Sequence, residues 1–351
     1  MNHLLADGGG QLQNIVIIAA CVMVGLAFLY GVLKKFSRMS WLGYQAIIVF
    51  AFTFLLGSLP AENGTLLFSL AVGLVIGGAA IIFVLGILLR KPFLAMEKNG
   101  LGLSFLNRLL GGLGALVNLF AALGVIAALA LVSLQGVGLE ALDVVYSNAI
   151  WTDFLGPHAL DFVIVYVFVA LLQSGYRAGF FRMILNVIVV GLVFLSVFLA
   201  MYMVLQVPFL NDFSHFIGSS FVESVGNIGA NWIGFAIASF IVAFVFLIIT
   251  VIVGVLLNLF LKFLGKFRIT VALNGALGFT VMAVLLIGIV LGFNCGVAFL
   301  AGDSLAQALP AEMQEMANAV KEYGRLAGDF LSSSPLSNIF YNYNPLRALV
   351  G

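Results

Sequence analysis

The placement of Lys and Arg between apolar segments constrains the fold of this chain more than any other feature. Eight apolar stretches of membrane-spanning length are separated by short loops, and basic residues occupy every second loop. Twelve of the 15 basic residues lie in four segments, Lys34–Arg38, Arg90–Arg108, Arg177–Arg182 and Lys262–Arg268, and the alternate loops hold none. Because basic loops are retained on the cytoplasmic side during insertion, the pattern predicts eight spans with both termini outside.

The composition agrees with a membrane protein. Charged residues make up 8% of the chain and hydrophobic residues 63%, whereas a globular domain carries roughly a quarter charged residues. The first 13 residues lack the basic residues of a signal peptide, so the first span is expected to be retained. Each span needs about 20 apolar residues, and the expected spans are Asn14–Leu33, Trp41–Leu59, Leu66–Leu89, Leu109–Leu134, Leu160–Tyr176, Met183–Leu205, Trp232–Phe260 and Ile269–Leu300.

Several classes of function find no support in these residues. No basic stripe of useful size suggests nucleic acid as a partner. The spans carry no Ser/His/Asp set or His-Glu zinc motif, so we expect no catalytic residues, no enzyme activity and no cofactor. Cys21 and Cys295 fall inside apolar spans, and His3, His158 and His215 are isolated, so no metal site is expected.

Two segments on the predicted outer side have apolar residues at helical spacing. Val207–Ile228 is expected to form one amphipathic helix at the membrane interface. Ser304–Leu331 is expected to form a second, with a stripe that runs from Leu305 through Met316 to Phe330. This stripe could pack on the protein's own outer surface, bind a partner or lie on lipid.

The two halves of the chain show the same order of short motifs, which indicates an internal repeat. Asn107-Arg108-Leu109-Leu110-Gly111 opens the fourth span, and Asn274-Gly275-Ala276-Leu277-Gly278 opens the eighth. Tyr30-Gly31 ends the first span, and Gly175-Tyr176-Arg177-Ala178-Gly179-Phe180 ends the fifth. Four spans is an even number, so the halves should be parallel repeats related by rotation about the membrane normal.

The second half resembles the colicin V production protein (CvpA) family of four-span bacterial inner-membrane proteins. In that family the first span opens with Asp and ends in a Gly-aromatic-Arg-x-Gly-Phe-x-Arg run, which Asp161 and Gly175-Tyr176-Arg177-Ala178-Gly179-Phe180-Phe181-Arg182 follow. The family's Asp/Asn-Arg-x-x-Gly motif matches Asn107, Arg108 and Gly111, and it matches Asn274 and Gly278 with Gly275 in place of Arg. The first half departs from the family pattern at Asn14 and Lys35, which stand in place of Asp and Gly.

The resemblance implies an organisation and a function. We expect an all-α polytopic protein with one four-span repeat over residues 1–158, a second over 159–302, and an outer helix and tail over 303–351. The family implies a non-enzymatic protein of the bacterial cytoplasmic membrane that supports toxin production or export, or envelope homeostasis. Its partners would be the lipid bilayer, a membrane or extracytoplasmic protein, or a second copy. The alternative is a channel or transporter with a pathway between the repeats.

Individual motif residues allow more than one interpretation. Asp161 could cap its own helix or belong to a proton or polar network. The Gly175–Arg182 run could be a tight turn with a topology anchor, or a lipid or partner contact. Gly288, Gly292 and Gly296 recur every fourth residue, which favours close helix packing over a pore.

The charge pattern makes a direct prediction about topology. In a chain without Cys21 and Cys295, a membrane-impermeant thiol reagent added to intact cells should label an Asn63→Cys variant. The same reagent should leave Phe36→Cys and Phe180→Cys unlabelled, because both lie in basic segments. Labelling of either from outside would refute the orientation.

Overall fold

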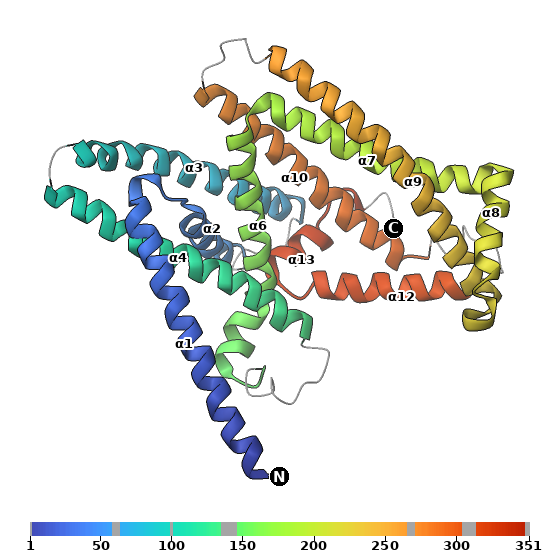
Figure 1. Ribbon diagram of the computed structural model, residues 1–351, viewed down its shortest axis with the longest axis horizontal. Helices are drawn as coiled ribbons and strands as arrows, with labels where there is room; N and C mark the ends of the chain where they lie inside the picture. The colour runs from blue at the N-terminus through green and yellow to red at the C-terminus, as the bar shows by residue number, and fades with distance from the viewer. Residues whose placement is uncertain are drawn as a thin grey trace. The chain divides into compact units, whose positions relative to one another are not determined.

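The structure is a computed structural model that describes residues 2–57, 64–98, 101–134, 146–264, 271–303 and 314–347. Within these ranges the chain folds into helices and contains no strand (Figure 1). Seven helices are long and apolar enough to cross a membrane, as in a multi-pass membrane protein. They are α1 (Asn2–Lys34), α3 (Gly64–Lys98), α4 (Leu101–Leu134), α6 (Gly156–Ala178), α7 (Phe180–Gln206), α9 (Val222–Leu264) and α10 (Val271–Ala301).

The remaining expected span, Trp41–Leu59, is shorter than the others. Its helix, α2 (Leu42–Gly57), has 16 described residues. At 1.5 Å per residue it is about 24 Å long, less than the roughly 30 Å of a hydrocarbon core. Leu59 itself lies outside the described residues, so a full eighth span stays a prediction.

The chain divides into two compact units. Unit 1 comprises Met1–Gln173 and Ala283–Gly351, and unit 2 comprises Ser174–Met282. The divisions fall inside α6 and α10, not at the repeat boundaries expected from the sequence. The repeat boundaries therefore remain a prediction, and each unit is described by itself.

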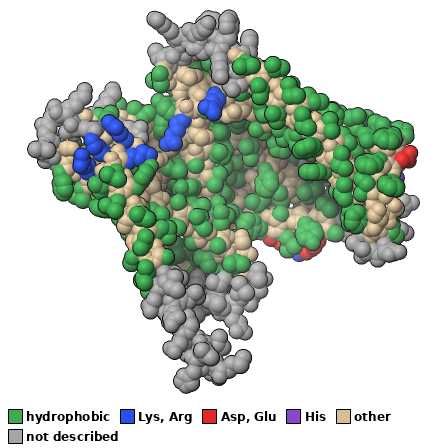
Figure 2. Space-filling model, viewed as in Figure 1, with side chains coloured by type: hydrophobic (Ala, Val, Ile, Leu, Met, Phe, Trp, Pro, Cys, Tyr) green, Lys and Arg blue, Asp and Glu red, His purple; other side chains and the backbone are tan. Residues whose placement is uncertain are grey.

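In unit 1, α1 packs along α4, and α2 packs against α3 and α4 (Figure 1). The short helix η1 (Phe36–Arg38) lies between α3 and α4, where the Phe36 ring is 4.9 Å from the Phe93 ring. This contact brings the first two basic segments to one end of the unit. Figure 2 shows Lys and Arg side chains gathered over these helix ends, while hydrophobic side chains cover most of the visible face. Such a surface requires lipid as its solvent.

In unit 2, α7 packs along α9, and α8 (Pro208–Ser219) folds back onto the start of α9. The expectation of one helix over Val207–Ile228 is wrong, because α8 ends at Ser219 and Val222 already belongs to α9. Gly218 permits the reversal: a Cβ there would lie 2.6 Å from the carbonyl oxygen of Ala230. The aromatic stripe does not pack inward, since Phe209 and Phe216 are 75% and 72% exposed.

The predicted outer helix is present as α12 (Gln314–Leu331), but it packs through a different face. Its glycines are buried, and a Cβ on Gly324 would lie 2.6 Å from the backbone of Leu300 and Ala301. The predicted stripe faces outward, with Tyr323 74% and Phe330 44% exposed. Small residues allow close backbone approach, which explains why the glycines make the contact. Residues 304–313, including Leu305, lie outside the described residues.

Candidate functional site

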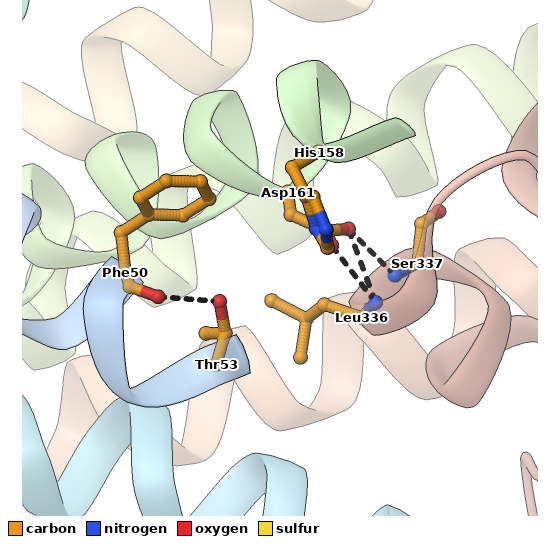
Figure 3. Close-up of polar contacts among 6 residues, drawn as sticks. All are labelled: Phe50, Thr53, His158, Asp161, Leu336 and Ser337. Atoms are coloured by element: carbon orange, nitrogen blue, oxygen red, sulfur yellow. Dashed lines mark hydrogen bonds and ion pairs between the residues drawn. The ribbon is translucent and has the colours of Figure 1, made fainter. Parts of the chain in front are cut away.

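A buried carboxylate near the start of α6 holds the C-terminal segment of unit 1. Asp161 is 1% exposed. The backbone N–H of Leu336 lies 3.1 Å from both carboxylate oxygens, and the N–H of Ser337 lies 3.1 Å from Oδ1. These N–H groups begin α13 (Pro335–Asn342), as Figure 3 shows. Asp161 therefore caps the N-terminus of a helix 175 residues away in the sequence.

This arrangement corrects one interpretation of Asp161. The residue was a candidate cap for its own helix, but α6 begins at Gly156, five residues earlier. The Asp161 carboxylate is instead part of a polar contact between α6 and α13. Ser334, at the N-cap position of α13, makes no capping hydrogen bond with its side chain, so the acceptor comes from α6.

His158 stands beside this carboxylate on the same face of α6. Its Nδ1 lies 3.6 Å from Asp161 Oδ2, and its side chain is 21% exposed. The imidazole packs on Phe54 of α2 with ring centroids 4.4 Å apart. Nearby, the Thr53 hydroxyl donates to the Phe50 carbonyl of its own helix, 2.6 Å away. Figure 3 shows His158 beside Asp161, whose carboxylate faces the start of α13.

The segment that Asp161 holds buries most of its apolar side chains. Leu336 and Phe340 are 1% and 3% exposed. The Phe340 ring stacks on Phe168 of α6, with centroids 6.2 Å apart. Asn344 donates from Nδ2 to the Leu291 carbonyl of α10 at 2.9 Å. We refer to Pro335–Arg347, which fills the space among α2, α3, α6 and α10 of unit 1, as the tail plug.

In unit 2, the residues that carry the family resemblance form one compact turn between α6 and α7. Gly175 and Gly278 touch, since a Cβ on Gly175 would lie 2.8 Å from the Gly278 carbonyl oxygen. Gly179 has a positive φ of 76°, which a residue with a side chain rarely adopts. The Asn274 Oδ1 accepts a 2.8 Å hydrogen bond from the Phe180 N–H at the start of α7.

The same arrangement occurs in unit 1. Gly31 and Gly111 are in backbone contact, and Lys35 has a φ of 66° where unit 2 has Gly179. Asn107, which is fully buried, accepts a 3.1 Å hydrogen bond from the Ser37 N–H. Gly31, Asn107 and Gly111 in unit 1 correspond to Gly175, Asn274 and Gly278 in unit 2, as the order of the sequence motifs predicts. The rotation that would relate the two halves stays a prediction.

The other motif residues lie around these turns. Tyr176 packs over Gly275, where a Cβ would lie 2.7 Å from its ring. This contact explains locally why Gly replaces the Arg of the family motif in the second half. Arg108, Arg177 and Arg182 are exposed side chains near the turns, in positions that suit headgroup contact.

The expected glycine packing in α10 is not found. A Cβ added to Gly288, Gly292 or Gly296 would meet no heavy atom within 4 Å. In the part of the chain that the structure describes, these glycines are therefore not contact points between helices. The close contacts fall instead on Gly278 of α10 and on Gly324 of α12.

One buried polar contact, between α2 and α6, was not predicted from the sequence. Gln173 of α6 donates from Nε2 to Gln45 Oε1 of α2, and both residues are buried. Gln45, Val49 and Thr53 recur every fourth residue and are all buried. Two polar residues, Gln45 and Thr53, on one face of an apolar helix were the sequence feature that could have predicted a buried polar contact.

Among the described residues, no group of three His, Cys, Asp or Glu side chains could hold a metal ion. Three charged side chains on α12, Glu322, Arg325 and Asp329, are exposed and pair with one another. Arg325 lies 2.7 Å from Glu322, and this hydrogen bond lowers the pKa of the Glu322 carboxyl. Exposed pairs of this kind contribute little to stability.

The chain matches no protein-family model, no curated protein and no solved structure. The family resemblance therefore stands on the motif residues quoted above.

The cap on α13 gives a testable consequence. An Asp161→Leu change should leave two buried N–H groups unpaired, at a cost of about 1–3 kcal/mol each. We expect faster hydrogen exchange across residues 335–347, measured by mass spectrometry on the purified chain. Asp153→Leu, at an exposed acid in the preceding turn, is the control and should leave this exchange unchanged. Equal exchange in the two variants would contradict the cap.

The glycine contact in unit 2 gives a second test. Gly278→Ala should place a Cβ 2.7 Å from the backbone of Gly179, so the variant must separate α10 from the turn. Overpacking of this kind costs about 1–3 kcal/mol and should lower the thermal unfolding midpoint in detergent. Gly292→Ala, in the same helix, should not lower it, because its Cβ meets open space. A lower midpoint for Gly292→Ala alone would refute the assignment of contacts.

Proposed function

We propose that this chain is a non-enzymatic protein of the bacterial cytoplasmic membrane that supports production or export of a secreted toxin, or envelope homeostasis. The proposal follows the resemblance to the colicin V production family. In this proposal both termini face outward, and the protein acts through lipid, a protein partner or a second copy of itself.

One observation carries the proposal: the motif residues of the resemblance form the same turn twice. In each unit a Gly–Gly contact, a residue with positive φ and an Asn cap lie together. Residues that share only composition with a family have no reason to meet in this way. Their agreement at both places supports a tandem arrangement of family-type repeats.

The outer face of α12 supports the interaction role. Tyr323, Leu326 and Phe330 are 74%, 51% and 44% exposed, while Glu322 and Arg325 lie beside them. An apolar surface edged by charges is typical of contact with a partner or with the membrane surface.

A deletion strain tests the role. Loss of the chain should reduce release of a secreted peptide toxin or raise sensitivity to envelope-disrupting detergent. Wild type and Gly292→Ala should restore the phenotype, whereas Asn274→Leu should not, because the Phe180 N–H loses its acceptor. Immunoblots of membranes establish that each variant is present. No change in toxin release or detergent sensitivity on deletion would refute the proposal.

The second candidate is a channel or transporter, and buried polar groups on α6 favour it. Asp161 and Gln173 are both buried in this candidate span. Against it, Val165, Val169 and Leu172 lie between them and are 0–1% exposed, so an apolar stretch separates the two groups. Proteoliposomes loaded with a pH-sensitive dye test this candidate. Proton flux that Asp161→Asn abolishes would favour it over an interaction role.

A further inference from the structure

Unit 1 also contains an apolar groove, which shares Phe50 and His158 with the contacts described above. The groove has a volume of about 390 Å³ and lies among α2, α4, η2 and α6. The helix η2 (Trp151–Leu155) is a π-helical turn, a form that often occurs at functional sites. The lining residues are Ile47, Phe50, Gly124, Ala127, Ala128, Leu131, Trp151, Leu155, His158, Ala159 and Phe162.

The space exists because one wall is built from small residues. Gly124, Ala127 and Ala128 of α4 face Phe50 and Phe162, whose rings contact each other at 5.1 Å. Larger side chains on α4 would fill the gap. The volume lies within the roughly 300–1,000 Å³ of small-ligand sites.

The surroundings of the groove indicate what enters it. Ile47 and Leu155 on its rim are 42% and 47% exposed, and the neighbouring Ile126 on α4 is 63% exposed. These side chains belong to apolar helices of a membrane protein, so lipid chains solvate them. A groove that opens on this surface meets acyl chains at high concentration.

Two residues that line the groove carry polar side-chain atoms, Trp151 of η2 and His158 of α6. Trp151 lies at its wall and packs on Tyr146 with ring centroids 5.8 Å apart, and such aromatic rings favour the membrane interface. His158 contributes a polar side chain near the first turn of α6. The rest of the lining is apolar and comes from α2, α4, η2 and α6.

We propose that this groove binds one acyl chain of a membrane phospholipid, with the headgroup near Trp151 and His158. The lining is apolar, the volume is that of a small-ligand site, and the rim is continuous with the lipid-facing surface. This proposal does not depend on the proposed role in export, because lipid binding is measured on the purified protein.

Fluorescence of Trp151 provides the test. Trp41→Phe and Trp232→Phe changes leave Trp151 as the sole tryptophan. Phosphatidylethanolamine with dibrominated acyl chains is then titrated into the delipidated full-length chain in detergent. We expect quenching that saturates at one lipid per chain and that unbrominated phosphatidylethanolamine reverses. Quenching that rises linearly without saturation would overturn the proposal.

Matched variants locate the site. Ala127→Phe and Ala128→Phe fill the groove and should weaken saturable quenching at least tenfold. Ala130→Phe, on an exposed position of the same helix outside the groove, should leave it unchanged. Circular dichroism and gel filtration establish that all three fold alike. Three outcomes would refute the proposal. The first is equal quenching in all variants, and the second is saturation by a brominated free fatty acid that phospholipid cannot displace. The third is a change of oligomeric state in the groove variants alone.

Discussion

The backbone N–H groups in the first turn of a helix need hydrogen-bond acceptors, which lipid cannot supply. The described helix packing depends on the side chains that provide these acceptors. An unpaired backbone N–H in an apolar medium costs several kcal/mol. Asn118 of α4 accepts from the Gly43 N–H at 2.7 Å, Asn274 of α10 accepts from Phe180, and Asp161 of α6 accepts from Leu336. In each case the acceptor comes from a different helix. The caps therefore also fix which helices lie side by side.

Small residues provide the second constraint. Lipid tails are as apolar as leucine, so large side chains gain little by leaving lipid for a helix interface. The contacts in both units fall on glycines such as Gly111, Gly278 and Gly324. Aromatic residues such as Phe209 and Tyr323 face outward. The apolar stripes of α8 and α12 face outward for this reason, and these helices pack through Gly218 and Gly324 instead.

Sequence predicted the helices well because span length and charge placement depend on local composition. The motif turns were also predictable, since Gly31, Gly175, Asn107 and Asn274 occur in the same order in both halves. The tail plug was not predictable, because its cap joins Asp161 to residues 175 positions later. Nor could spacing alone separate Gly278, which has no room for a Cβ, from Gly292, which has room. Which face of a helix meets a neighbour depends on tertiary packing.

Position 161 carries an acid where the other caps carry amides, and this acid accepts from two backbone donors. An asparagine side chain has one oxygen, and Asn274 accepts from a single N–H of α7. The first turn of α13 presents two buried N–H groups, and both oxygens of Asp161 are used for them. A carboxylate also matches the positive end of the helix dipole, and His158 Nδ1 lies 3.6 Å from Asp161 Oδ2. His158 also lines the acyl-chain groove, so whatever occupies the groove lies one side chain away from the cap that holds the tail plug.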